Sequence, residues 1–576
     1  MTVLLETLCG HLAALYPQSE SAALAQRLCT IMRIIPGGPE PEPYCNHWDE
    51  GDVYVISYAD SLLSETHLPL ENLQHFLGHY LAESISGVHI LPFFPYSSDD
   101  GFAVIDYYQV NQSVGDWPQI REIAAQFDLM ADVVINHCSS RSGWFENYRQ
   151  GKSPGKGYFF EGDPQADLSQ VVRPRTSPLL TKVQTLDGER HVWCTFSADQ
   201  VDLDFSNPEV LCEFVAILRF YLEQGIRVFR LDAVAFVWKI PGTSCINLAQ
   251  THTLVRLLRL LIEHQRPDAI IITETNIPNQ ENLAYFGNGN EAHAIYNFAL
   301  PPLLLNALLT GNGRHLRNWL MTLPPARSGT AYFNFIASHD GIGLRPVEGI
   351  LDRAETDRLI GAMERFGGRI SWRDKPDGSR AAYEINIALW EAMKGTLAGE
   401  DHWQLARFLC AHTLMLGIEG IPALYIHSLL ATGNDHARVA HSNHNRHINR
   451  HKWDYPQLQA LLQDDGSHHH QVLAAMKLRL AIRRRQRAFH PNATQYTLQL
   501  GDAVVGFWRQ SLCRRQSIFA LHNLTAQPQA LALSSLNLAA LDPWTDLLSD
   551  QSYEDHQGQI ELAPYQCVWL SNLSDG

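Results

Sequence analysis

Three acidic residues each end or follow an apolar run that is typical of a β-strand, and they are the side chains best suited to chemistry. They are Asp232, Glu274 and Asp340, and their runs are 226–231, 269–273 and 332–339. A buried carboxylate is costly unless it is paired or used chemically. In a (β/α)8 barrel the active site lies at the carboxyl ends of the strands. Two such carboxylates with a third, stabilising acid suit cleavage of a glycosidic bond with retention of configuration.

Neighbouring residues give these acids different environments. Arg230 precedes Asp232 by two positions on a predicted strand, so both side chains point to one face. An opposite charge at short range would keep Asp232 ionised, as a covalent nucleophile must be, although a structural ion pair is the alternative. Glu274 has no adjacent cation in sequence, so burial would raise its pKa and let it carry a proton. A helix N-cap or loop carboxylate is the alternative for Glu274, and His339 directly precedes Asp340.

The elements that must position these acids alternate between strand and helix. We expect strands at 53–57, 87–91, 129–135, 226–231 and 270–273, and helices at 70–82, 120–127, 209–223 and 248–263. Such alternation favours a parallel sheet with helices outside it, and eight units fit between residue 52 and about residue 490. The predicted fold class is therefore α/β, with a (β/α)8 TIM barrel at its centre.

Changes in pattern divide the chain into five predicted parts. Helical periodicity before a Pro- and Gly-rich break predicts an N-terminal extension, and short alternating runs near the C-terminus predict a β-sandwich-like domain. A stretch rich in Gly, Pro and aromatic residues predicts a loop-rich insertion in the barrel. The parts are 1–50 (helical extension and linker), 51–137 (first part of the barrel), 138–200 (inserted subdomain), 201–492 (second part of the barrel, with a mobile loop at 343–400) and 493–576 (β domain).

Composition and charge exclude several classes of protein. Hydrophobic residues make up 45% of the 576 residues, and the formal net charge of −17 argues against a nucleic-acid partner. The ten cysteines include no C-x2-C pair, which favours reduced thiols in a cytoplasmic protein. Neither a signal peptide nor a membrane-spanning run is expected. The histidines between His436 and His451, and the run 468–470, lack the regular spacing of a metal site, so no metal or other cofactor is predicted.

Four ordered segments, 133–137, 229–234, 272–274 and 338–340, resemble the motif regions of the α-amylase superfamily, glycoside hydrolase family thirteen. Further segments resemble its sucrose phosphorylase-like branch. They are 56–60, 88–95, 99–102, 173–175, 242–245, 298–303 and 448–450.

The resemblance implies a role for each matching residue. Asp232 would be the nucleophile, Glu274 the general acid/base and Asp340 the transition-state stabiliser. The residues implied to bind the glucosyl unit and its partner are Asp99, Phe102, His137, Arg230, His339, Arg450 and Glu384, and those implied to bind phosphate are Arg175 and Tyr383. Relatives often hold calcium near Asn136, but this branch generally does not, so no metal is predicted there.

The implied activity is transfer of an α-glucosyl unit from a small glucoside to inorganic phosphate. Glu384 stands where sucrose-specific members typically carry Gln, which puts sucrose in doubt as the substrate. Segments 47–50, 238–245 and 273–276 look most similar to glucosylglycerate phosphorylases. Phosphorolysis of sucrose, sucrose 6′-phosphate or glucosylglycerol stays an alternative, as do α-glucoside hydrolysis or transglucosylation and a catalytically inactive binding protein. The expected partners are the glucoside and phosphate, with no membrane, and the expected state is a monomer or homodimer.

Overall fold

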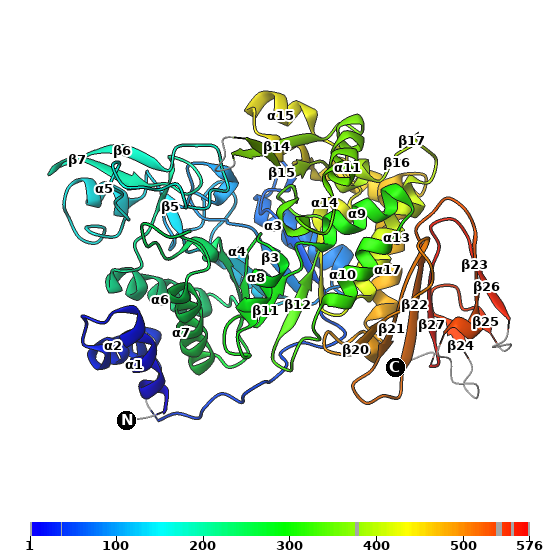
Figure 1. The fold of residues 1–576 in the computed structure, drawn as a ribbon, viewed down its shortest axis with the longest axis horizontal. Helices are drawn as coiled ribbons and strands as arrows, with labels where there is room; N and C mark the ends of the chain where they lie inside the picture. Colours follow the sequence, from blue (N-terminus) through cyan, green and yellow to red (C-terminus); the bar gives the residue numbers. More distant parts are fainter. Residues whose placement is uncertain (1–2, 36, 375–378, 537–543, 554–557, 574–576) are drawn as a thin grey trace.

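Eight parallel strands close into a barrel within the residues that the computed structural model describes, which are 3–35, 37–374, 379–536, 544–553 and 558–573. In order around the barrel they are β1 (Tyr54–Ser57), β3 (Gly87–Ile90), β4 (Asp128–Val134), β9 (Val228–Asp232), β10 (Ile270–Thr273), β11 (Ala294–Tyr296), β12 (Ala331–Asn334) and β18 (Ile421–Tyr425). The predicted fold class is confirmed: strands follow one another in chain order, joined by helical crossovers (Figure 1).

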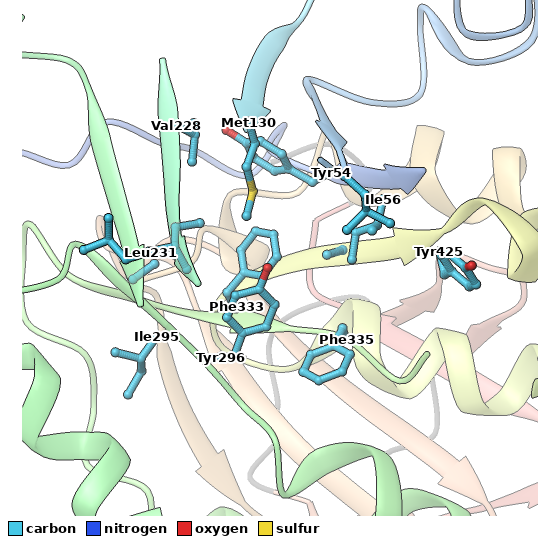
Figure 2. Close-up of a cluster of buried hydrophobic side chains, with 14 of the residues drawn as sticks. Tyr54, Ile56, Met130, Val228, Leu231, Ile295, Tyr296, Phe333, Phe335 and Tyr425 are labelled. Atoms are coloured by element: carbon cyan, nitrogen blue, oxygen red, sulfur yellow. The ribbon is translucent and has the colours of Figure 1, made fainter. Parts of the chain in front are cut away.

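The barrel strands are mostly apolar and are buried on both faces. The strands β1, β3, β9, β10, β11, β12 and β18 are buried along their whole length, as expected where helices cover a parallel sheet. Large side chains fill the interior, among them Tyr54, Met130, Tyr296 and Phe333 (Figure 2). The ring of Phe333 lies 5.0 Å from that of Tyr296 and 5.7 Å from that of Tyr54, centroid to centroid. The core is therefore a packed one that holds the strand ends in fixed positions.

Helices follow the strands. They include α3 (Pro69–Phe76), which continues as a π-helical turn over Leu77–Leu81, α4 (Trp117–Ala124), α6 (Pro208–Glu223), α7 (Ala249–Gln265), α9 (Leu300–Thr310), α10 (Arg314–Thr322), α13 (Gln404–Gly417) and α17 (His468–Arg483). The four that were predicted, α3, α4, α6 and α7, lie close to their predicted positions. Helix α4 begins three residues before its predicted start because Asp116 caps it, accepting a hydrogen bond from the Trp117 amide.

The three acids sit differently with respect to their strands. Asp232 is the last residue of β9, and Glu274 directly follows β10. Strand β12 ends at Asn334, so the run 332–339 is strand only at its start, and Asp340 lies on the loop beyond it. At the last residue of the strand, the Asn334 side chain donates a hydrogen bond to the carbonyl of Glu419.

Two insertions rise above the carboxyl ends of the barrel strands. The first contains β5 (His137–Ser139), α5 (Gly143–Arg149), β6 (Leu180–Thr185), β7 (Gly188–Trp193) and β8 (Gln200–Asp202). The second corresponds to the predicted loop 343–400 and contains β13 (Ile342–Gly343), α11 (Arg353–Arg365), β14 (Arg369–Asp374), β15 (Arg380–Asn386), α12 (Leu389–Ala392), β16 (Gly395–Thr396) and β17 (Gly399–Glu400). It holds a three-stranded sheet in the order β13-β15-β14, and its residues 375–378 lie outside the described ranges.

The two ends of the chain pack on different sides of the barrel. Helices α1 (Val3–Leu15) and α2 (Ser21–Met32) pack against α6 and α7 (Figure 1). At the other end lies a six-stranded sheet, ordered β20-β21-β22-β27-β24-β25, beside the pair β23 and β26. Its strands are β20 (Thr494–Thr497), β21 (Val504–Gln510), β22 (Ser517–Asn523), β23 (Gln529–Ala532), β24 (Trp544–Asp546), β25 (Ser552–Tyr553), β26 (Gln559–Leu562) and β27 (Cys567–Ser571). Residues 537–543, 554–557 and 574–576 of this part are not described. Among the helices of the described residues, none combines the length and apolar character needed to cross a membrane.

Candidate active site

A pocket opens at the carboxyl ends of the barrel strands, and most of the predicted site residues line it. These are Asp99, Phe102, His137, Arg175, Arg230, Asp232, Glu274, His339, Asp340, Tyr383 and Glu384. Arg450 is the exception. It lies behind the pocket wall, where its guanidinium donates to Asp100 at 2.9 Å and to the carbonyl of His339 at 2.8 Å.

Arg230 is the cation at the centre of the pocket. Its Nη1 lies 2.6 Å from Oδ1 of Asp232 and 2.5 Å from Oδ1 of Asp132, while Nη2 lies 3.9 Å from Oε1 of Glu274. Asp132 also contacts His89, at 2.6 Å. The pair expected from the spacing of Arg230 and Asp232 therefore forms, and buried partners fix the orientation of its guanidinium.

The protonation states of Asp232 and Glu274 depend on the same surroundings, namely burial and the charge of Arg230. Burial raises the pKa of both carboxyls, against the opposing effect of Arg230; the negative charge of Glu274 further raises the pKa of Asp232, and that of Asp340 further raises the pKa of Glu274. Arg230 contacts Asp232 directly but stands farther from Glu274. When the pair holds a single proton, the negative charge is therefore better stabilised on Asp232 and the proton on Glu274.

At pH 7 Asp340 is held ionised mainly by arginines of the segment 446–450. Arg446 Nη1 lies 2.6 Å from Oδ1 of Asp340, and His339 Nε2 lies 3.5 Å from Oδ2. Burial alone would raise the pKa of Asp340, but Arg446 first, then His339 and Arg450, lower it below its ordinary value. Arg446 was missed in the sequence because it lies in the histidine-rich segment. Its position four residues before Arg450, a predicted site residue, could have indicated that it lies near the same pocket.

Glu384 lines the pocket but is already paired. Its side chain is buried, and its two oxygens accept hydrogen bonds from Nε and Nη2 of Arg446 at 2.9 and 3.0 Å. The same guanidinium therefore joins Glu384 to Asp340. Glu384 therefore holds in place the cation that contacts Asp340.

Arg175 and Tyr383 meet across the pocket mouth, although they come from different insertions. The guanidinium carbon of Arg175 lies 5.3 Å from the centre of the Tyr383 ring and 5.9 Å from that of Phe196. Within the described residues, no carboxylate lies within 4.0 Å of the Arg175 nitrogens. Stacking on two rings thus holds this cation in place while its N–H groups stay available to an anion.

Aromatic rings and short polar contacts shape the deep end of the pocket. The Phe102 and His339 rings stack at a centroid distance of 5.1 Å, with 6° between their planes. His137 Nε2 lies 3.0 Å from the carbonyl of Phe102. Burial lowers the pKa of His137, and burial lowers that of His339 to about 3, so both rings are neutral at pH 7.

Two adjacent aspartates point in different directions. Asp99 and Asp100 have φ values of 52° and 49°, in the left-handed region that non-glycine residues rarely adopt. Asp100 faces away from the pocket and pairs with Arg450 and His447, the latter at 2.8 Å. Asp99 faces the pocket, and its buried Oδ1 has no hydrogen-bond partner among the described residues. A carboxylate oxygen in this setting is suited to accept a hydrogen bond from a sugar hydroxyl.

Relatives of known activity span almost the whole chain. It is 40% identical to the glucosylglycerate phosphorylase of Escherichia coli over 562 residues, covering 97% of this chain and 96% of that protein. It is 39% identical to the glucosylglycerate phosphorylase of Allomeiothermus silvanus, covering 98% of each. Residues 79–339 match the family model described as "Alpha amylase, catalytic domain". The chain belongs to the α-amylase family.

A solved structure supports the fold of this α-amylase family member. The crystal structure of sucrose 6F-phosphate phosphorylase from Thermoanaerobacter thermosaccharolyticum superposes with a TM-score of 0.71. The two chains are 24% identical, and the match covers 82% of this chain and 94% of the other. At that identity the likeness concerns the fold alone.

A buried lysine ties the first insertion of this α-amylase family member to its barrel. Lys239 Nζ lies 2.8 Å from Oδ1 of Asn136 and 2.9 Å from Oδ2 of Asp202.

Of the histidines in the 436–451 segment, His447 pairs with Asp100 and His451 with Asp435. In the part of the chain that the structure describes, no three His, Cys, Asp or Glu side chains are grouped as ligands for a metal ion.

Proposed function

We propose that this enzyme is a retaining glucoside phosphorylase that acts on 2-O-α-glucosylglycerate. It transfers the α-glucosyl unit to inorganic phosphate and gives α-D-glucose 1-phosphate and glycerate. The observation that carries the choice of substrate is the identity of 39–40% to glucosylglycerate phosphorylases over nearly the full length of each chain. The arrangement of carboxylates around Arg230 supports the reaction type.

In the first step the glycosidic bond of the donor breaks. Glu274 gives its proton to the glycosidic oxygen, and the electron pair of the breaking bond leaves with glycerate. A carboxylate oxygen of Asp232 attacks the anomeric carbon from the opposite side, which forms a β-glucosyl-aspartate. Arg230 supports this assignment because it holds Asp232 in the ionised form that attacks.

Asp340 stabilises the positive charge that develops on the sugar ring. Arg446, at 2.6 Å, keeps it ionised and fixes its direction. Hydrogen bonds from ring hydroxyls to a fixed carboxylate strengthen as oxocarbenium character grows, which favours the transition state over the bound substrate. Asp99, Phe102, His137 and His339 form the remaining contacts of the glucosyl unit in this proposal.

In the second step phosphate takes the place of glycerate. A phosphate oxygen attacks the anomeric carbon, the bond to Asp232 breaks, and Glu274 accepts a proton from the attacking phosphate. Arg175 and Tyr383 hold the phosphate, with the planar guanidinium donating to two oxygens. This second inversion restores the α configuration in the product.

The proposal is tested by turnover of 2-O-α-glucosylglycerate with and without phosphate, with the product anomer read by NMR before it mutarotates. Formation of α-glucose 1-phosphate that requires phosphate is the expected result. Release of free glucose at a rate indifferent to phosphate would establish a hydrolase instead. In the reverse direction, α-glucose 1-phosphate is offered with glycerate, glycerol, fructose or fructose 6-phosphate. Phosphate release with an acceptor other than glycerate would reassign the substrate.

The compartment and assembly proposed with this function are the cytoplasm and a monomer or homodimer. The cysteine side chains are free thiols, and among them Cys138 and Cys194 are buried in the first insertion and Cys410 in α13 of the barrel. This is consistent with a protein that folds in a reducing compartment.

A further inference from the structure

Among the described residues, four arginines line the pocket, and they differ in whether they already have partners. Those that line it are Arg175, Arg230, Arg345 and Arg446. Arg230 is paired with Asp132 and Asp232, and Arg446 with Asp340 and Glu384. Arg175 rests on two aromatic rings. Within the described residues Arg345 has no ion pair, and its buried Nε has no hydrogen-bond partner. Two guanidinium groups in the pocket are therefore available to anions, and the proposed phosphate site uses only one of them.

Arg345 is brought to the pocket by the sheet of the second insertion. It follows β13 by two residues, and Gly343 of β13 pairs with Glu384 of β15. The amide of Leu344 donates to the carbonyl of Tyr383 at 3.0 Å. Arg345 is thus fixed relative to Tyr383 by backbone hydrogen bonds.

Asn276 lies against the same strand and also lacks partners. It follows Glu274 by two residues on an extended loop, so both side chains line the pocket. Its Oδ1 is buried with no hydrogen-bond partner among the described residues. A β-carbon at position 343 would lie 2.8 Å from Nδ2 of Asn276, so a larger residue there would displace the Asn276 side chain. A guanidinium Nε and an amide oxygen without partners in the described part of the chain therefore belong to residues that line the same pocket as the proposed acid/base.

These two groups match what a hydroxy acid needs. A carboxylate requires N–H donors, which a guanidinium and an amide nitrogen supply, and a hydroxyl donor requires an acceptor such as Oδ1 of Asn276. In phosphate the negative oxygens share an atom with the attacking oxygen. In glycerate the carboxylate is one carbon farther from the reacting hydroxyl. The two acceptors therefore place their negative charge at different points. A second cation in the pocket, in addition to Arg175, is suited to bind the carboxylate.

We propose that Arg345 and Asn276 form the carboxylate-binding part of the acceptor subsite. They select an acceptor whose carboxylate is adjacent to the hydroxyl that receives the glucosyl unit. This inference rests on the proposed function, since it concerns which acceptor the glucosyl-enzyme accepts. Arg345 contributes the charge, and Asn276 contributes a donor and an acceptor.

The test compares two reactions of one variant, Arg345→Gln. The first is synthesis of glucosylglycerate from α-glucose 1-phosphate, read as kcat/KM for glycerate. The second is exchange of labelled phosphate into α-glucose 1-phosphate, which passes through the glucosyl-enzyme without glycerate. We expect synthesis to fall by about 10–100-fold more than exchange, because a charge-assisted hydrogen bond to the carboxylate is lost. Arg345→Lys, which keeps the charge but not the planar fork, should recover part of the loss.

Arg358→Gln is the matched control, since Arg358 lies on α11 of the same insertion but outside the active-site pocket. It should leave the ratio of synthesis to exchange as in the wild type. An equal loss of both reactions in Arg345→Gln, or a loss of neither, would overturn the inference while leaving the phosphorylase intact. A wild-type enzyme without exchange would instead refute the proposed function, and one with exchange but no use of glycerate would refute both the substrate and the carboxylate subsite.

Discussion

Glu384 and Arg446 form a bidentate ion pair in which both carboxylate oxygens are engaged, at 2.9 and 3.0 Å. Because Arg446 also contacts Asp340, this pair sets the position of a cation beside the proposed transition-state stabiliser. Glu384→Gln removes the charge and turns an amide N–H toward the guanidinium. We expect kcat/KM for phosphorolysis to fall by about 10-fold, with kcat affected more than KM. Glu384→Asp, which keeps the charge, should lose less. If the Gln variant keeps the wild-type kcat, Glu384 has no positioning role.

Asp232→Asn should abolish turnover, because an amide does not attack the anomeric carbon. Phosphorolysis is expected to fall by at least about 10⁴-fold, as when a nucleophile that acts together with its partner is removed. The melting temperature should stay close to that of the wild type or rise, since burial penalises the charge at this position. Turnover unchanged in this variant would rule out the mechanism.

The pH dependence of kcat/KM should reveal the shared proton of Asp232 and Glu274. The pKa of Glu274 is raised by burial, so the protonated acid persists to a higher pH than for an exposed Glu. Activity is present below that raised pKa and is lost as pH rises through it. Glu274→Gln with α-glucosyl fluoride, whose leaving group needs no proton, should form the glucosyl-enzyme without this alkaline decline. A decline that persists in the variant would assign it to another group.

Arg175→Gln should weaken phosphate binding without blocking formation of the glucosyl-enzyme. We expect the KM for phosphate to rise by about 10–100-fold and the share of glucosyl groups captured by water to increase. Steady-state kinetics with separate measurement of glucose and glucose 1-phosphate distinguishes these effects. Arg190→Gln is the control, because Arg190 is a half-buried residue of β7 in the same insertion that pairs only loosely with Glu161, at 3.6 Å. An unchanged KM for phosphate in Arg175→Gln would contradict the assignment.

Lys239→Met should destabilise the fold, because it leaves the carboxylate of Asp202 buried without its cation. Both side chains are about 1% exposed or less. The expected loss in the free energy of unfolding is about 3–5 kcal/mol, measured by urea denaturation. Lys182→Met removes a partner of Glu189 at the surface, where the side chains are 63% and 49% exposed, and should cost less than about 1 kcal/mol. Equal losses in the two variants would show that burial of the Lys239 pair has no energetic importance.

The barrel could be predicted because most of its strands can be recognised from their own residues, without knowledge of their neighbours. Each is a short apolar run buried on both faces, and the run 270–273 coincides with β10. The contents of 343–400 could not be read in the same way, since its strands are short and partly exposed. One signal there was readable, because Asp352 and Glu355 form a capping box at the start of α11.

The site was predictable where partners are close in sequence and not where they are distant. Arg230 and Asp232 are two residues apart, so their pairing follows from the spacing of a strand. Arg446 is 62 residues from Glu384, and only the fold brings them together. Asp99 and Asp100 have the same side chain but point in different directions. Both have positive φ angles, which could not be predicted from the residue types.

The origin of the residues around the pocket bears on how such enzymes diverge. The groups proposed to cleave the donor, Asp232 and Glu274, end strands of a rigid core, whereas Arg175 and Arg345 come from separate insertions. Under the proposed roles, changes confined to the segments 173–175 and 343–345 would alter the choice of acceptor, while the chemistry that cleaves the donor would stay with the barrel.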